Sequence, residues 1–181
     1  MSFQKHFELL ATYNEWMNVK LYEASEKLPT SELLIDRGAF FKSMLGTLNH
    51  IVVGDTVWLQ RFAEHPSCKF TLKSLTENPR PSDLNGFMFS DIKQLYKHRQ
   101  QLDKIIITWI ANLNEQDLDY TLSYKNMKGL PFSRQYSNLI LHFFNHQTHH
   151  RGPVTTLLSQ AGQDIGVTDL RALIPGSHHA Q

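Results

Sequence analysis

Two histidines in the last third of the chain, His146 and His150, are four residues apart in an apolar helical pattern. In a helix this spacing places both rings on one face, about one turn apart. Neutral imidazole is a good ligand for zinc, nickel, cobalt or copper, and two rings so spaced can converge on one ion. Burying two such rings without partners would cost at least about 2 kcal/mol. We therefore expect a bound ion, or hydrogen-bond partners, between them.

The same pattern places the pair in a stripe that we predict to face the protein core. The stripe recurs every three or four residues and contains Leu139, Phe143, His146, His150, Val154, Leu157 and Ala161. A third histidine, His50, lies beside the apolar seam of an earlier helical segment. If the two helices pack side by side, three nitrogens with an open position would form the arrangement of a catalytic zinc site. The alternative is that His146 and His150 only form hydrogen bonds inside the core.

Other residues of this segment fit a metal site less well. His142 lies four residues before His146, so a His142–His146 pair is the main geometric competitor. His149 is rotated by about 100° from His150 and should face a neighbour or solvent. Gln147 occupies the position of the glutamate in the HExxH motif of metalloproteases, which excludes that motif.

Further polar residues lie on or beside the apolar seams. Asn14 and Arg99 are candidates for orienting a substrate, although an asparagine can also set helix register and an arginine can extend its guanidinium to a rim. Asn145 flanks the histidine pair and could be a hydrogen-bond partner of a ligand ring. Asp55 follows His50 at about 140° around the helix, which favours a supporting or structural role over direct ligation.

Four long helical patterns would position these residues. They run from about Phe3 to Leu28, Phe41 to Glu64, Ser90 to Leu113 and Tyr136 to Ala161. Each carries an apolar stripe on one face, as helices that share a core do. The chain length suits one domain. We therefore predict an all-α four-helix bundle that forms a single domain over residues 1–181.

The connections between these helices differ in kind. The stretch from His65 to Gly86 is long and polar and contains three prolines, which suits a crossover between the second and third helices. Two short alternating runs around Asn126–Gly129 predict a small hairpin before the fourth helix. Residues 167–175 predict a short capped turn of helix.

Composition limits the classes of function. The formal net charge is +1 and no cluster of five or more Lys or Arg occurs, which argues against nucleic-acid binding by phosphate neutralisation. A single cysteine, Cys68, excludes an internal disulfide and is typical of a reducing compartment. The N-terminal region lacks the apolar run of a signal peptide, and no apolar run is long enough to cross a membrane. We expect a cytoplasmic protein without a membrane or nucleic-acid partner.

Three blocks of this sequence resemble the DinB family. They are YNEWMN at 13–18, RGAFFKSMLGTLNHIVVGDTVWLQRF at 37–62 and HFFNHQTHHRG at 142–152. The resemblance implies a four-helix bundle with a long crossover, a homodimer, and one divalent metal ion whose three ligands fall on His50, His146 and His150. Exposed aromatic side chains such as Trp16 could supply the apolar patch of the dimer.

The resemblance also implies a reaction class. Some relatives transfer low-molecular-weight thiols to electrophiles, and others isomerise or hydrolyse small molecules with thiol cofactors. It therefore implies a metal-dependent transferase or hydrolase that acts on a small molecule, with a low-molecular-weight thiol as partner. The ion would be zinc or nickel first, with cobalt, manganese or iron as alternatives. The competing hypotheses are a non-catalytic, stress-related protein with a structural ion, and a helical dimerisation module whose histidines bind nothing.

One position departs from the family pattern. The family usually continues HHRG with glutamine, whereas this chain has Pro153. Proline inside a helix removes a backbone hydrogen bond and disfavours helical geometry at the preceding residue, here Gly152. We expect a kink or break just after His150.

Overall fold

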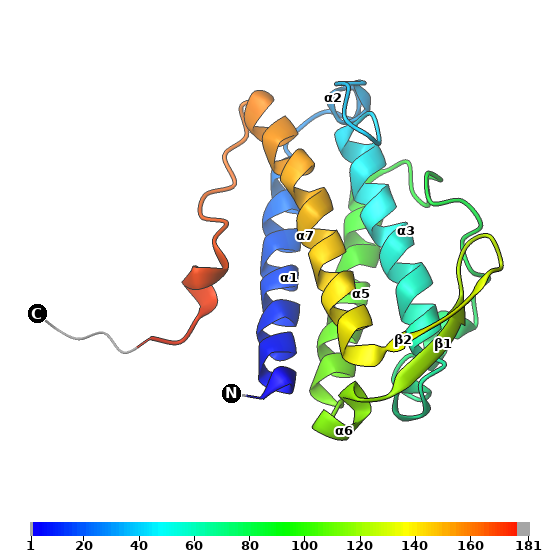
Figure 1. The fold of residues 1–181 in the computed structure, drawn as a ribbon. Helices are drawn as coiled ribbons and strands as arrows, with labels where there is room; N and C mark the ends of the chain where they lie inside the picture. Colours follow the sequence, from blue (N-terminus) through cyan, green and yellow to red (C-terminus); the bar gives the residue numbers. More distant parts are fainter. Residues whose placement is uncertain (1, 177–181) are drawn as a thin grey trace, which may run out of the picture.

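The computed structural model of the protein describes residues 2–176, so both ends of the predicted domain 1–181 lie outside the described residues. Four long helices lie side by side (Figure 1) and correspond to the four predicted segments: α1 (Phe3–Ser25), α3 (Met44–Phe62), α5 (Ile92–Ala111) and α7 (Tyr136–Gln160). α1 and α7 run in one direction, and α3 and α5 run in the other (Figure 1). The described chain is mostly helical, as predicted, with one small two-stranded sheet.

Each long helix packs against two others. α1 lies against α5 and α7, and α3 lies against α7 and α5. Aromatic rings fill the core near the start of α7, where Trp109 stacks on Phe62 with ring centroids 5.0 Å apart and meets Phe143 edge-on at 5.8 Å. The buried indole N–H of Trp109 donates to the hydroxyl of Tyr136 at 3.0 Å. Such aromatic pairs contribute about 0.5–1.5 kcal/mol each beyond area burial, so this cluster fixes α3, α5 and α7 against one another.

Side-chain caps set three of the four helix starts. Ser2, Ser43 and Asp91 each accept a hydrogen bond from the backbone N–H three residues further on, an interaction that typically contributes about 1 kcal/mol. α3 begins at Met44, three residues later than predicted. The reason is a tight turn before it, in which Lys42 pairs back to residue 39 and adopts a φ of 67°.

The predicted crossover connects α3 to α5 and is held against α3 by buried amides. Asn49 accepts from the backbone N–H of Phe89 at 3.0 Å, and Gln60 donates to the carbonyl of Leu75 at 2.8 Å. Short helices that the sequence did not predict lie in the connections: α2 (Thr30–Leu34) after α1, and η1 (Pro66–Cys68) and α4 (Lys73–Thr76) in the crossover. The crossover is therefore a fixed part of the structure beside α3.

The predicted hairpin lies between the short helix α6 (Glu115–Leu118) and α7. Its strands β1 (Thr121–Lys125) and β2 (Pro131–Gln135) pair antiparallel. The side chain of Asn126 accepts backbone N–H groups within the turn, and Gly129 has a φ of 78°, which glycine adopts without steric cost. The hairpin leads the chain directly into α7.

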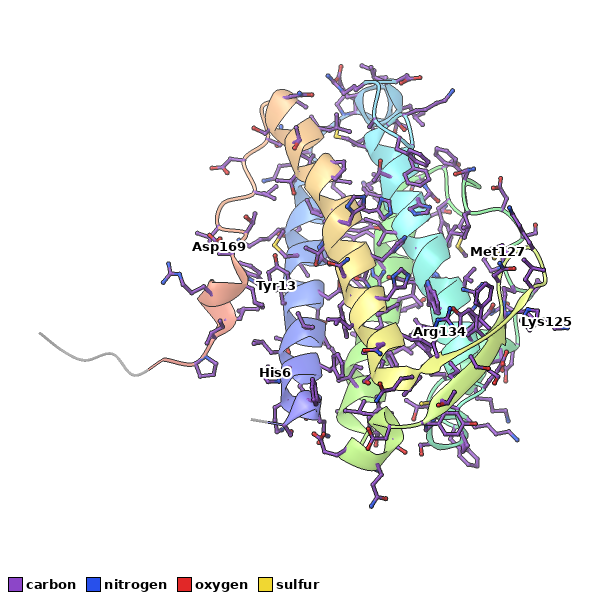
Figure 2. All side chains as sticks on the ribbon, in the orientation of Figure 1. His6, Tyr13, Lys125, Met127, Arg134 and Asp169 are labelled. Atoms are coloured by element: carbon purple, nitrogen blue, oxygen red, sulfur yellow. The ribbon has the colours of Figure 1, made fainter. Side chains whose placement is uncertain are left out.

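The segment after α7 returns along α1 (Figure 1) and contains the short helix η2 (Leu170–Leu173), which agrees with the predicted turn. Figure 2 labels Tyr13 on the α1 face beside this segment, and its hydroxyl donates to the carbonyl of Thr168 at 2.7 Å. Lys20 places its ammonium 4.0 Å from the ring centroid of Trp16. Because Trp16 is half-buried, the prediction of an exposed aromatic patch at this residue is wrong.

α7 passes through Pro153 without interruption, so of the predicted kink or break after His150 the break is wrong. The conflict that disfavours a helix before a proline involves the proline ring and, in part, the Cβ of the preceding residue. Here the preceding residue is Gly152, which has no Cβ. The ring therefore removes one backbone hydrogen bond, to the carbonyl of His149, without ending the helix.

None of the helices within residues 2–176 combines the length and the apolar character that crossing a membrane requires.

Candidate metal centre

The three histidines singled out by the sequence meet between α3 and α7. His50 projects from α3, whereas His146 and His150 project from α7. One ring nitrogen of each lies within 4.8 Å of a ring nitrogen of each of the others. The Nε2 atoms of His50 and His146 are 3.3 Å apart. The side-by-side packing of the second and fourth long helices, on which the three-nitrogen hypothesis depended, is therefore present.

Gly54 allows α7 to approach α3 at this level. It lies one helical turn after His50, and a Cβ built on it would be 2.9 Å from Cε1 of His146. That separation is well inside the 3.5–4.0 Å at which two carbons pack best. The His146 ring thus occupies the space that the side chain of any other residue would need at position 54.

A backbone carbonyl orients the His50 ring. Its Nδ1 lies 2.9 Å from the carbonyl oxygen of Leu84 in the crossover. Because a carbonyl only accepts, Nδ1 carries the hydrogen, and Nε2 presents its lone pair toward His146. Proteins commonly fix the tautomer of a metal-binding histidine in this way. The sequence contains no signal for this partner, since every residue has a backbone carbonyl.

Aromatic side chains hold the histidine rings in place. Phe41 stacks on His50 with ring centroids 3.7 Å apart, and it meets the ring of His150 edge-on at 5.4 Å. His142 packs instead against Trp58, with centroids 5.1 Å apart. The competing His142–His146 pair is therefore not the one that joins the cluster.

Burial and crowding keep the three imidazoles neutral. Desolvation, followed by the neighbouring imidazoles, lowers the pKa of His146 from its ordinary 6.5 to about 3. The same two causes lower the pKa of His150 to about 4, and desolvation lowers the pKa of His50. Because a histidine must be unprotonated to bind a metal ion, all three rings are in their binding form at neutral pH.

The donor set fits a divalent ion. Nitrogens around a tetrahedral zinc ion lie about 2.0–2.1 Å from the metal and hence about 3.4 Å from one another. The separation of 3.3 Å between His50 and His146 matches that spacing. Within residues 2–176 the cluster contains no carboxylate or thiol, so an ion held by it would keep its full positive charge. Three protein ligands leave a position for a further molecule.

The histidines lie at the side of the core rather than in its centre. At their level of α7 the deepest side chains are Gln147 and Arg151, whereas His146 and His150 are half-buried. The predicted core stripe is therefore wrong in its middle. Its remaining buried members are Leu139, Phe143, Val154 and Leu157.

Buried polar side chains from all four long helices form a second polar cluster in the core. We call this group the buried ion network: Asn14, Asn18, Asp55, Arg99, Asp103, Gln147 and Arg151. Arg99 pairs with Asp55 and, at 3.0 Å, with Asp103. Arg151 donates to Asn14, whose Nδ2 donates to Asp103 at 3.1 Å. Arg99 thus pairs with both aspartates, as buried charges require. Arg151 instead donates to the uncharged side chains of Asn14, Gln147 and Thr148.

Of the four predicted supporting residues, three belong to the buried ion network and one lies on the surface. Asn14 and Arg99 are 1% and 0% exposed and belong to the buried ion network. Asp55 belongs there too, as the partner of Arg99. Asn145 is exposed on α7. No hydrogen bond within residues 2–176 joins any of them to His50, His146 or His150.

The three histidines line an open pocket, which we call the histidine pocket. Its volume is about 430 Å³, within the range of small-molecule sites. His149 is exposed, as predicted, and lines the pocket without joining the ligand cluster. The other lining residues are Ala39, Phe40, Phe41, Thr47 and Pro153. Of these, only Pro153 was singled out in the sequence, whereas Ala39, Phe40 and Phe41 lie in the turn that precedes α3 and gave no signal there.

A helical protein in which three neutral histidines converge from two helices beside an open pocket is, as a class, a candidate metal-binding protein. A sequence model of the DinB family matches residues 1–177, and the chain belongs to this family. One relative, Protein DinB from Bacillus subtilis (strain 168), is 24% identical over 165 residues, which cover 88% of each chain. No solved structure matches at a significant level. The resemblance seen in the three sequence blocks is thus confirmed.

Proposed function

We propose that this protein binds one divalent metal ion through His50, His146 and His150 and uses it in a reaction on a small molecule. The observation that carries the proposal is the orientation of three neutral imidazoles toward an open pocket. Structural zinc sites are closed by four protein ligands, whereas catalytic sites keep one position open. We further propose that the four long helices form one four-helix-bundle domain, as the family membership suggests.

The proposed chemistry is thiol S-transfer or a related thiol-assisted reaction. A bound divalent ion supplies Lewis acidity, which lowers the pKa of a thiol or a water molecule toward the neutral range. In the transfer, a sulfur–carbon bond forms while the bond from that carbon to its leaving group breaks. The leaving group takes the electron pair, and the thiol proton passes to solvent.

The residues of the chain would position the reactants. The carbonyl of Leu84 and the ring of Phe41 fix His50, so the three donors need little rearrangement. Phe40 and Pro153 line the pocket and would exclude water from one side of the substrate. Zinc and nickel are the proposed ions because neutral imidazole suits both, with cobalt, manganese and iron as alternatives.

A structural ion is the second candidate, because the three ligands come from α3 and α7 and an ion would tie these helices together. Cobalt, loaded in place of the native ion into protein without a histidine tag, separates the two functions. For an enzyme we expect cellular thiols to produce sulfur-to-metal charge-transfer bands, and a model electrophile to be conjugated by the wild type but not by His150→Ala. A spectrum that no thiol perturbs would favour the structural ion.

A further inference from the structure

We infer that the histidine pocket takes an uncharged, flat aromatic group of a small molecule, which packs against Phe40 beside the three histidines. The inference rests on the proposed function for the chemistry at the histidines. Its own basis is the wall that Phe40 and Phe41 form at the mouth of the pocket.

The side chain of Phe40 is presented to solvent at that mouth. It is 90% exposed, so it contributes almost nothing to the core of the protein. Within residues 2–176 its aromatic partner is Phe41, whose centroid is 4.8 Å away at an interplanar angle of 69°. Phe41 in turn stacks on His50. The two phenylalanines thus extend the aromatic surface of the site outward, and the outer ring is free to contact a ligand.

The turn that carries Phe40 and Phe41 has a constrained backbone, as Lys42 and Gly46 show. Lys42 has a φ of 67°, the one positive φ of a non-glycine residue within 2–176, and its N–H donates to the carbonyl of Ala39 at 2.7 Å. A Cβ at Gly46 would lie 2.4 Å from the carbonyl oxygen of Phe41. Such strained positions persist where the surroundings enforce them and are concentrated at ligand sites.

The lining of the pocket lacks the groups that recognise charged ligands. It contains no lysine, arginine, aspartate or glutamate among the described residues. The hydroxyl of Thr47 already donates to the carbonyl of Ser43 at 2.9 Å. Away from the histidine nitrogens, a carboxylate, phosphate or ammonium group would lose its hydration without gaining a counter-charge. An uncharged ring loses little hydration there and gains aromatic contact with Phe40.

The test compares three ligands that share one ring and differ in charge. Metal-free protein in chelator is titrated with 1-naphthylmethanol, 1-naphthoate and 1-naphthylmethylammonium, and binding is followed by amide shifts in two-dimensional NMR. The metal-free form is used because a bound ion would itself attract the carboxylate. We expect the alcohol to bind about tenfold or more tightly than either charged compound, with the largest shifts at Phe40, Phe41 and Thr47.

Two matched variants assign the contact to Phe40. Phe40→Ala should weaken binding of the alcohol by about two- to tenfold, the effect of one aromatic contact. Phe70→Ala removes a phenylalanine that is 89% exposed in the crossover and should leave the affinity unchanged. The inference is overturned if either charged compound binds as tightly as the alcohol, if Phe40→Ala binds like the wild type, or if the alcohol shows no saturable binding.

Metal analysis of the wild-type protein before any chelator is added separates this inference from the proposed function. Stoichiometric metal uptake without binding of the alcohol would sink the aromatic-ligand inference alone. Binding of the alcohol by protein that takes up no metal would support the aromatic pocket and contradict the proposed function.

Discussion

Gly54 of α3 lies directly against the ring of His146 of α7, and the ring can occupy this position because glycine has no side chain. A Cβ at residue 54 would lie 2.9 Å from Cε1 of His146. The glycine therefore sets how closely the two helices approach at the level of the three histidines. It also sets the distance across which His146 and His50 face each other.

Replacing Gly54 by alanine should weaken metal binding about tenfold, an effect typical of residues that support a ligand. The new methyl group would push the His146 ring away from His50. Metal affinity is measured by competition with a chromophoric chelator. Gly176→Ala is the control, because no atom lies within 4 Å of a Cβ built there. Equal affinities in the two variants would show that the contact does not position the ligand.

Replacing Arg99 by methionine should destabilise the protein by about 3–5 kcal/mol, because Asp55 and Asp103 would be left as buried charges without a cation beside them. The free energy of unfolding is measured by urea denaturation. Arg80→Met is the matched control, since Arg80 pairs with Glu64 at 3.4 Å on the surface and should contribute less than about 1 kcal/mol. Similar losses in both variants would contradict a stabilising role for the buried ion network.

Acid should destabilise the metal-free protein through His146 and His150. In the unfolded chain both take up a proton near the ordinary pKa of 6.5, whereas burial and the neighbouring imidazoles hold the folded-state pKa values at about 3 and about 4. Between these limits the unfolded state binds more protons, so stability falls as pH falls from 6.5 toward about 4.

The contribution of this pair must be separated from that of Asp55, whose pKa burial raises to about 6 and which acts in the opposite sense. Urea midpoints at about pH 7 and about pH 5 are therefore compared between the wild type and the double variant His146→Gln, His150→Gln. The acid-induced loss should be smaller in the double variant. An equal loss would place the pH dependence elsewhere.

The family resemblance predicts a homodimer. Sedimentation at micromolar concentration should then show a species of twice the chain mass of 21.0 kDa. Finding the 21.0 kDa species alone would contradict this prediction. Trp16 is half-buried and gives no evidence for a dimer interface, so this prediction rests on the family membership.

The long helices could be predicted because each carries an apolar stripe over many turns, a signal that single substitutions do not erase. The residues at which these helices end could not be predicted from the same signal. α1 ends at Ser25 rather than Leu28, because a periodic pattern does not mark the last hydrogen bond. The break predicted at Pro153 does not occur in α7, since the glycine before it removes part of the usual steric conflict.

The histidine cluster could be predicted because few residue types bind metal ions and His146 and His150 have the spacing for it. The sequence could not, however, predict which of the neighbouring seams of α7 faces the core. Gln147 and Arg151 are also polar, and the partner that makes Arg151 a core residue, Asn14, is 137 residues away in the sequence. Contacts of this kind, like the carbonyl of Leu84 beside His50, arise only from the folded arrangement.

The measurement that tests the central claim most directly is the metal content of protein purified without a histidine tag, determined by elemental analysis for wild type, His146→Ala and His149→Ala. His149 is the control because it lines the same pocket without joining the ligand cluster. We expect close to one ion per chain in the wild type and in His149→Ala, and almost none in His146→Ala. Equal metal content in the two variants would contradict the assignment of His50, His146 and His150 as the metal ligands.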